Sequence, residues 1–176
     1  MRGAGEENEI VDIVDRQGRV VGREPRASVH GNPALLHPVV HVHVLNSKNE
    51  LLLQKRAACK LVQPDKWDTA VGGHVVSGES VAGALEAEVG EELGIDLINP
   101  VLLFSYVHVN DFESEFVYVH RMLHEGPFNP NPQEVAELRF WPFAAIEASL
   151  HSGVFTTNFV EEYRMLLDCP GFLPTV

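Results

Sequence analysis

Alternating apolar and polar positions predict most of the secondary structure of this chain. Residues 39–46, VVHVHVLN, place three valines on one face of an extended segment and two histidines with a leucine on the other. A period of two is typical of a β-strand that packs one face on a core. We interpret His41 and His43 as partly buried strand residues without a ligand role. Similar patterns predict further strands over residues 9–15, 19–24, 51–55, 102–109, 114–123 and 137–141.

One long helix is predicted over residues 81–93. Apolar residues recur every four positions from Val81 to Val89 and form a stripe along one side. Ser80 precedes this segment as a candidate N-cap, and Gly94 stands where a glycine commonly ends a helix. Shorter helical segments are expected over residues 25–29, 144–151 and 158–167.

The polar face of the long helix is acidic. Glu88 and Glu92 lie one turn apart with Glu91 beside them, and residues 73–95 contain no lysine or arginine. Like charges at this spacing cost roughly 0.2–0.5 kcal/mol per pair, so helix stability does not explain them. A hard divalent cation, Mg²⁺ or Mn²⁺, explains them better than a solvated acidic face, because such ions prefer carboxylate oxygens and leave positions for water and phosphate.

Composition and charge narrow the possible functions. The formal net charge is −12, and the segment between Lys66 and Arg121 has no lysine or arginine, which argues against binding to a nucleic-acid polymer and favours metal ions. The sequence shows no apolar run of membrane-spanning length and no secretory signal pattern. Cys59 and Cys169 belong to no paired motif. We therefore expect one domain over residues 1–176, without disulfides, in the cytoplasm and without a membrane partner.

Around the acidic helix the sequence resembles the Nudix hydrolases. Eight of the nine positions that their signature specifies match over residues 73–95. The matching residues are Gly73, Glu79, Glu88, Val89, Glu91, Glu92, Gly94 and Ile95. Ala87 replaces the remaining residue, an arginine that in the family helps to orient the neighbouring glutamate.

This resemblance implies an α/β fold, an α/β/α sandwich around a mixed central β-sheet. It also implies hydrolysis of a diphosphate linkage in a small molecule of the nucleoside-diphosphate type or a related compound. By analogy with the family, the Gly73 carbonyl and the carboxylates of Glu88, Glu91 and Glu92 are expected to hold Mg²⁺ or Mn²⁺. Glu88 is the expected base for the attacking water, and Glu79 is expected to support the loop before the helix.

Outside residues 73–95, the chain resembles one branch of the superfamily, the type-I isopentenyl diphosphate isomerases and related hydrolases. The isomerases hold a metal ion with three histidines and two glutamates, and they bind the substrate diphosphate with an arginine and a lysine. The matching positions are His30, His37, His74, Glu113 and Glu115 for the metal, and Arg56 and Lys60 for the diphosphate. Such a ligand set suits a second ion, Mn²⁺ or Zn²⁺.

Two substitutions bear on the reaction. The isomerases carry a cysteine immediately before the signature glycine, where this chain has Gly72, and they do not keep the full set of signature glutamates. Hydrolysis is therefore preferred over an isomerase-like activity, and Ala87 motivates a third interpretation, a non-catalytic ligand-binding domain. Residues 155–159 and the last helix are a candidate homodimer surface, and Trp67 and Trp141 are expected in the core or a pocket wall.

Overall fold

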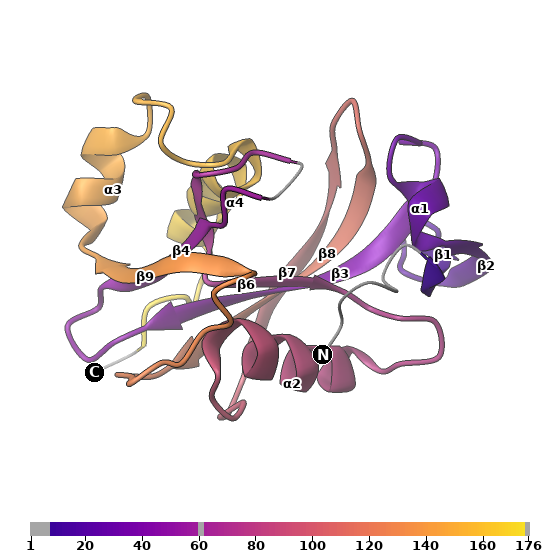
Figure 1. Ribbon diagram of the computed structural model, residues 1–176. Helices are drawn as coiled ribbons and strands as arrows, with labels where there is room; N and C mark the ends of the chain where they lie inside the picture. Colours follow the sequence, from indigo (N-terminus) through magenta and orange to yellow (C-terminus); the bar gives the residue numbers. More distant parts are fainter. Residues whose placement is uncertain (1–7, 60–61, 175–176) are drawn as a thin grey trace.

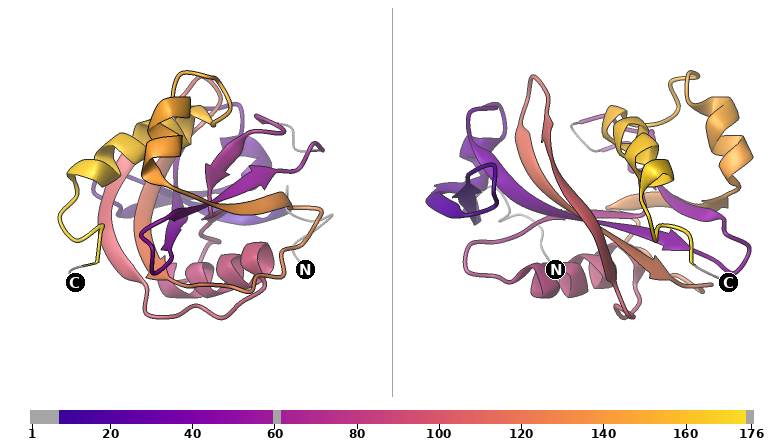
Figure 2. Two further views of the ribbon diagram at one scale, coloured as in Figure 1. Left: turned by 90° about the vertical axis from the view of Figure 1, so that its left-hand side faces the viewer. Right: turned by 180° about the vertical axis from the view of Figure 1, so that it is seen from behind.

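The computed structural model describes residues 8–59 and 62–174, and these form three layers, with a mixed β-sheet between helices (Figures 1 and 2). Helix α2 (Val81–Leu93) covers one face of the sheet, whereas α3 (Phe143–Ser149) and α4 (Thr157–Asp168) lie over the other. This is the α/β/α sandwich that the sequence predicts.

Within the described residues the sheet has seven strands, in the order β5-β4-β3-β8-β7, with β6 paired to β3 and β9 paired to β4. Among the strands of the described residues, β3 and β8 form the only parallel pair of this sheet. The strands are β3 (Leu36–Leu45), β4 (Leu51–Arg56), β5 (Trp67–Thr69), β6 (Val71–His74), β7 (Val101–Val109), β8 (Ser114–Leu123) and β9 (Val135–Trp141). A separate hairpin, β1 (Ile10–Val14) and β2 (Val20–Pro25), leads into the one-turn helix α1 (Arg26–Val29).

Each face of the sheet has its own core, as the alternation in β3 predicts. Val40, Val42 and Val44 are fully buried in the core beneath α2. Val39 and Leu45 point the other way, into the core beneath α3 and α4. A strand buried on both faces in this manner is rigid, so side chains that it carries are held in fixed positions.

Helix α2 begins and ends at the predicted residues. The Ser80 hydroxyl accepts a hydrogen bond from the Gly83 N–H at 3.1 Å, which satisfies one free donor of the first turn. Gly94 has φ of 64°, and a Cβ there would lie 2.1 Å from the carbonyl oxygen of Asn129. Glycine is therefore required both by the backbone conformation and by the close approach of the neighbouring segment.

The sequence did not predict β5 and β6 as strands. They have three and four residues, and β6 contains Gly72 and Gly73, so neither carries a recognisable alternation. They are formed by pairing with the longer strands β4 and β3. Local propensity is overridden here by long-range hydrogen bonding.

Two other sequence-based interpretations can be compared with the structure. The proposed dimer surface over residues 155–159 is wrong for its two phenylalanines, because Phe155 and Phe159 are 4% and 0% exposed in the core of this same chain. Trp67 is confirmed as a core residue, 8% exposed and packed against Trp141 with ring centroids 5.2 Å apart.

Both cysteines are free. In the part of the chain that the structure describes, the helices are too short or too polar to span a bilayer.

Candidate functional site

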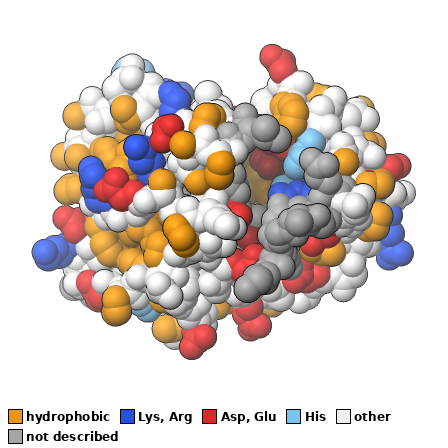
Figure 3. Space-filling model, in the orientation of Figure 1, with side chains coloured by type: hydrophobic (Ala, Val, Ile, Leu, Met, Phe, Trp, Pro, Cys, Tyr) orange, Lys and Arg blue, Asp and Glu red, His pale blue; other side chains and the backbone are white. Residues whose placement is uncertain are grey.

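A pocket of about 410 Å³ opens where β3 changes its pairing partner. The C-terminal end of β3 pairs with β4, with Val44 opposite Leu52, whereas its middle, residues 39–42, pairs with β6, with Val39 opposite His74. The sheet therefore splits, and acidic and histidine side chains gather in the hollow (Figure 3). The carboxylates lining the pocket are those of Asp68, Glu88, Glu91, Glu92, Glu113, Glu115 and Glu134.

All five residues of the predicted histidine–glutamate set lie together. His37 on β3 is directly opposite Glu115 on β8, and the rings of His37 and His74 stack with centroids 5.1 Å apart. His30 Nε2 lies 3.4 Å from His74 Nε2 and 3.6 Å from Glu113 Oε2. Two overlapping groups have their ligand atoms within 4.8 Å of one another: His30 with His74 and Glu113, and His37 with Glu113 and Glu115.

The residues of this set fit a metal ion. His37 Nε2 and Glu115 Oε2 are buried and make no hydrogen bond within the described residues, which is costly for polar atoms unless another group satisfies them. Burial lowers the pKa of His37 to about 4, so its imidazole is neutral, as a metal ligand must be. Burial, together with the charge of Glu113, raises the pKa of Glu115 to about 7. A cation bound between these groups would satisfy the buried His37 Nε2 and Glu115 Oε2 atoms, and it would reduce the repulsion between the Glu113 and Glu115 carboxylates.

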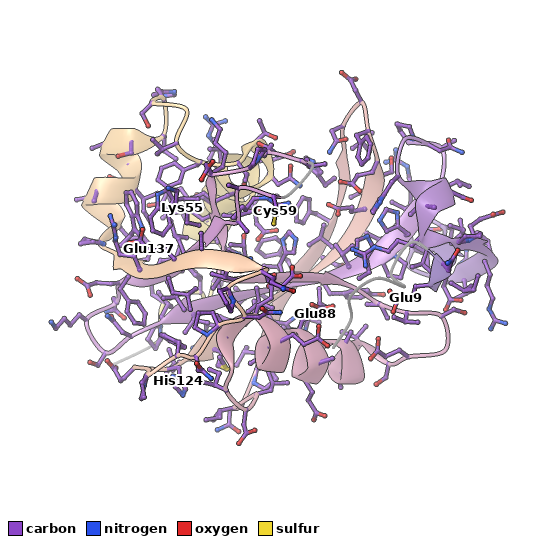
Figure 4. All side chains as sticks on the ribbon, in the orientation of Figure 1. Glu9, Lys55, Cys59, Glu88, His124 and Glu137 are labelled. Carbon is purple, nitrogen blue, oxygen red and sulfur yellow. The ribbon has the colours of Figure 1, made fainter. Side chains whose placement is uncertain are left out.

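The acidic helix contributes the opposite wall of the pocket. Glu88 is 9% exposed and lies against Gly73, where a Cβ would come within 2.0 Å of its Cδ. Glu92 Oε2 accepts a hydrogen bond from the Gly72 N–H at 2.8 Å, and the Gln54 amide donates to both Glu92 oxygens at 3.3 and 3.4 Å. Figure 4 shows Glu88 between α2 and the sheet. The strand β6 and helix α2 thus hold these carboxylates at the pocket.

The remaining signature residues have distinct surroundings. Glu91 also lines the pocket, whereas Glu79 bonds the loop before α2, accepting the Val76 N–H at 3.2 Å. Within residues 8–59 and 62–174, no group of three ligand atoms as close as 4.8 Å includes a glutamate of α2. The α2 carboxylates are therefore more widely spaced than the histidine–glutamate set.

Basic side chains reach the pocket from two elements. Arg56 at the end of β4 donates to the carbonyl oxygen of Val62 at 3.1 Å and pairs with Asp68 at 3.3 Å. Lys60, its predicted companion, lies outside the described residues. Arg26 of α1 also lines the pocket and was not singled out from the sequence. Its position four residues before His30, at the other end of a predicted helical turn, was the available signal.

The interpretation of His41 and His43 as buried strand residues is confirmed, and both are hydrogen-bonded to one buried carboxylate that the sequence did not indicate. Glu162 of α4, which is fully buried, accepts hydrogen bonds from His41 Nδ1 at 2.8 Å and from His43 Nε2. The Tyr106 hydroxyl donates to the same carboxylate at 2.8 Å. His41 also lines the pocket, so this cluster connects the core beneath α4 to the site.

Comparison with known proteins identifies the family. The family model for the NUDIX domain matches residues 35–159, and the chain therefore belongs to the Nudix family. It is 35% identical over 141 residues to an isopentenyl-diphosphate Delta-isomerase of Halorhodospira halophila, covering 78% of this chain and 80% of that protein. It is 37% identical over 129 residues to an uncharacterized Nudix hydrolase of Listeria innocua, covering 72% and 76%.

A solved structure supports the fold. DR0079 of Deinococcus radiodurans superposes with a TM-score of 0.77 at 23% identity, covering 89% of this chain and 98% of that protein. The relatives in sequence bear both isomerase and hydrolase names, so family membership leaves the reaction and the substrate to be argued from the site residues.

Proposed function

We propose that this protein is a metal-dependent Nudix hydrolase that cleaves a diphosphate linkage in a small nucleoside-diphosphate-type or related compound. The observation that carries the proposal is the presence of Gly73 and three signature carboxylates, Glu88, Glu91 and Glu92, on the wall of one polar pocket. Such residues suit Mg²⁺ or Mn²⁺. A bound ion of this kind supplies neutralisation of the diphosphate oxygens and a lowered pKa for a coordinated water.

The chain itself has two tasks in this reaction. Glu88, held against Gly73, accepts the proton of the attacking water, and its low exposure of 9% keeps competing solvent away. Glu92 keeps one orientation because the Gly72 N–H and the Gln54 amide both donate to it. Because the Glu92 side chain is already held in one orientation, less conformational entropy is lost when the metal ion and substrate bind.

The histidine–glutamate set provides a second ion site, for Mn²⁺ or Zn²⁺. His30, His37, His74, Glu113 and Glu115 would hold it, and the buried, unsatisfied atoms of His37 and Glu115 support this assignment. Arg56, with Lys60 and Arg26, supplies positive charge for the substrate diphosphate.

An isomerase-like activity is the second candidate, because relatives named as isomerases match most of the chain and Cys59 lines the pocket. Cys59 is exposed, on the segment after β4, with its thiol 3.7 Å from the carbonyl oxygen of Gln133. Gly72, in contrast, offers no side chain at all next to Gly73. Hydrolysis is preferred because the signature carboxylates line the pocket and the position next to Gly73 is a glycine, not a cysteine.

The test is a screen of nucleoside diphosphates, nucleotide sugars, coenzymes and prenyl diphosphates with Mg²⁺ and Mn²⁺, scored for phosphate or mononucleotide release. Glu92→Gln is expected to lower kcat by about 100-fold or more, since it removes a ligand charge. Glu86→Gln, on the exposed side of the same helix, is the matched control and is expected to stay within about twofold of wild type.

Two outcomes contradict the proposal. One is a Glu92→Gln variant as active as wild type. The other is a wild-type protein inert on every compound. Metal-dependent ligand stabilisation in a thermal shift assay, without product, would then indicate the third alternative, a non-catalytic binding domain.

A further inference from the structure

Glu162 is an ionisable side chain at a depth where charges are rarely tolerated. It is 0% exposed, in the second turn of α4, and three donors surround it: His41 Nδ1 at 2.8 Å, His43 Nε2 and the Tyr106 hydroxyl at 2.8 Å. Three donated hydrogen bonds favour the carboxylate form over the acid. A buried carboxylate also needs a positive charge in contact with it, and its contacts offer two imidazoles.

The environment of each imidazole decides which one carries that charge. His43 is 0% exposed, and its second nitrogen, Nδ1, is buried without a hydrogen-bond partner among the described residues. Protonating His43 would bury an unsatisfied N–H donor, which is unfavourable. His41 donates to Glu162 through Nδ1 and lines the pocket, so its second nitrogen has access to solvent or ligand. The positive charge therefore belongs on His41.

The pKa of His41 agrees with this placement. Burial alone would lower it, but the charge and hydrogen bond of Glu162, with smaller contributions from Glu115 and Asp68, raise the pKa to about 9.

The ring of His41 is presented to the pocket beside Gly72. The two residues are direct partners in the pairing of β3 with β6. A Cβ at position 72 would lie 3.3 Å from Cδ2 of His41 and 3.5 Å from its Nε2. Any side chain at this position would therefore cover the ring edge that carries Nε2. Glycine leaves that edge open, at the same point of β6 that bonds Glu92 through its N–H.

The pocket otherwise carries a large negative charge. Its lining includes seven carboxylates, and Arg56, a basic residue of its wall, is already paired with Asp68. An anionic diphosphate needs fixed positive groups in addition to metal ions in such surroundings. His41 lies on the α4 side of β3, across the sheet from the carboxylates of α2, and so reaches the ligand from a different direction.

We infer that His41 is a substrate-contacting residue, whose Nε2–H donates a hydrogen bond to an oxygen of the bound diphosphate, and that Glu162 is the positioning residue that orients its ring and balances its charge. This inference rests on the proposed function for the nature of the ligand. Tyr106 and His43 complete the support by holding the carboxylate of Glu162 from its other sides. Through Glu162, helix α4 thus takes part in building the site.

The test uses methylenediphosphonate, a diphosphate analogue that is not hydrolysed, with Mg²⁺ and calorimetric measurement of Kd. His41→Phe keeps the ring shape and removes the donor, and we expect its Kd to rise by about tenfold or more. His41→Gln places an amide N–H near the position of Nε2 and is expected to recover binding to within about threefold of wild type. His124→Phe is the matched control, a half-buried histidine after β8 whose ring packs against Phe128 and does not line the pocket, and its Kd should equal that of wild type.

A second readout does not depend on variants that fold poorly. In wild-type protein with ¹⁵N-labelled histidine, the Nε2 resonance of His41 should shift when methylenediphosphonate and Mg²⁺ are added, whereas the resonances of His124 should not. The inference is overturned if this resonance stays unchanged, or if folded His41→Phe binds as tightly as wild type. It is also overturned if His41→Gln loses as much affinity as His41→Phe, since that result indicates a packing role.

These outcomes are distinct from failure of the proposed function. A protein that binds the analogue through His41 but turns over no compound contradicts hydrolysis and leaves this contact standing. A protein that hydrolyses diphosphates with the same KM in wild type and His41→Phe contradicts the contact alone.

Discussion

A Cβ atom on Gly73 would lie 2.0 Å from Cδ of Glu88 and 2.2 Å from its Oε1. Strand β6 and helix α2 therefore meet at a point where only a glycine fits, and the Glu88 carboxylate rests on the Gly73 backbone. The proposed base and the proposed carbonyl ligand are adjacent because of this packing. Two sequence positions fifteen residues apart thus form one unit of the site.

Replacing this glycine should impair activity more than folding. In Gly73→Ala the added methyl displaces the Glu88 carboxylate, and we expect kcat to fall by more than about tenfold while the fold survives. Gly90→Ala is the control, because a Cβ there meets nothing within 4 Å. It should leave kcat unchanged and raise the free energy of unfolding by up to about 1 kcal/mol, the helix preference of alanine over glycine. Equal activity of Gly73→Ala and wild type would show that the contact is irrelevant to turnover.

The histidine–glutamate set should retain its own metal ion. His37→Ala removes a buried ligand atom, and metal analysis of the purified variant should show one Mn²⁺ or Zn²⁺ fewer per chain than wild type. His151→Ala, which changes an exposed histidine, should retain the full metal content. Identical metal content in wild type and His37→Ala would contradict this ion site.

Binding of that ion should depend on pH. The pKa of Glu115 is raised to about 7, so below pH 7 a proton must leave this carboxyl before it ligates a metal. The apparent Kd for Mn²⁺ should therefore weaken by roughly tenfold per unit as the pH falls below 7, and level off above 8. Calorimetry in buffers of different ionisation enthalpy should detect the released proton. A Kd that is constant between pH 6 and 8 would exclude Glu115 as a ligand.

The pair of His41 and Glu162 should make stability pH-dependent. The folded-state pKa of His41 is about 9, above its ordinary 6.5, so its contribution is fully present below 6.5 and is lost as the pH rises through 9. The pKa of Glu162 is shifted the other way: burial opposes the shift, but the two histidines lower it below 4.5, so its contribution is lost in acid. The shift of His41 corresponds to about 3 kcal/mol.

Urea unfolding at pH 6 and pH 9.5 tests this dependence. The difference in unfolding free energy between wild type and the His41→Phe, Glu162→Leu double variant should shrink by about 3 kcal/mol from the lower to the higher pH. The double variant is used because it leaves no buried charge unpaired. A difference that stays constant would contradict the charged state of His41.

Much of the site follows from the sequence because its residues lie within local patterns. The ends of α2 were set by Ser80 and Gly94, and both are where capping chemistry requires them. The spacing of glutamates on this helix placed Glu88 and Glu92 on one face, and the structure puts both at the pocket.

The rest depends on contacts between distant segments, which local patterns do not encode. Glu162 is 121 residues from His41, and its spacing on α4 reads as an ordinary amphipathic helix. His41 and His43 were read as strand residues because alternation alone does not reveal what covers a face. Likewise, β5 and β6 form only because the longer strands pair with them.

Hydrolysis of a diphosphate linkage can be followed directly by ³¹P and ²H NMR of the purified protein in deuterated water, with Mg²⁺, on a panel of diphosphates that includes isopentenyl diphosphate. We expect new monophosphate resonances from at least one compound, lost in Glu92→Gln and retained in Glu86→Gln, with no deuterium entering isopentenyl diphosphate. Deuterium incorporation into isopentenyl diphosphate, without any new phosphate resonance across the panel, would contradict hydrolysis.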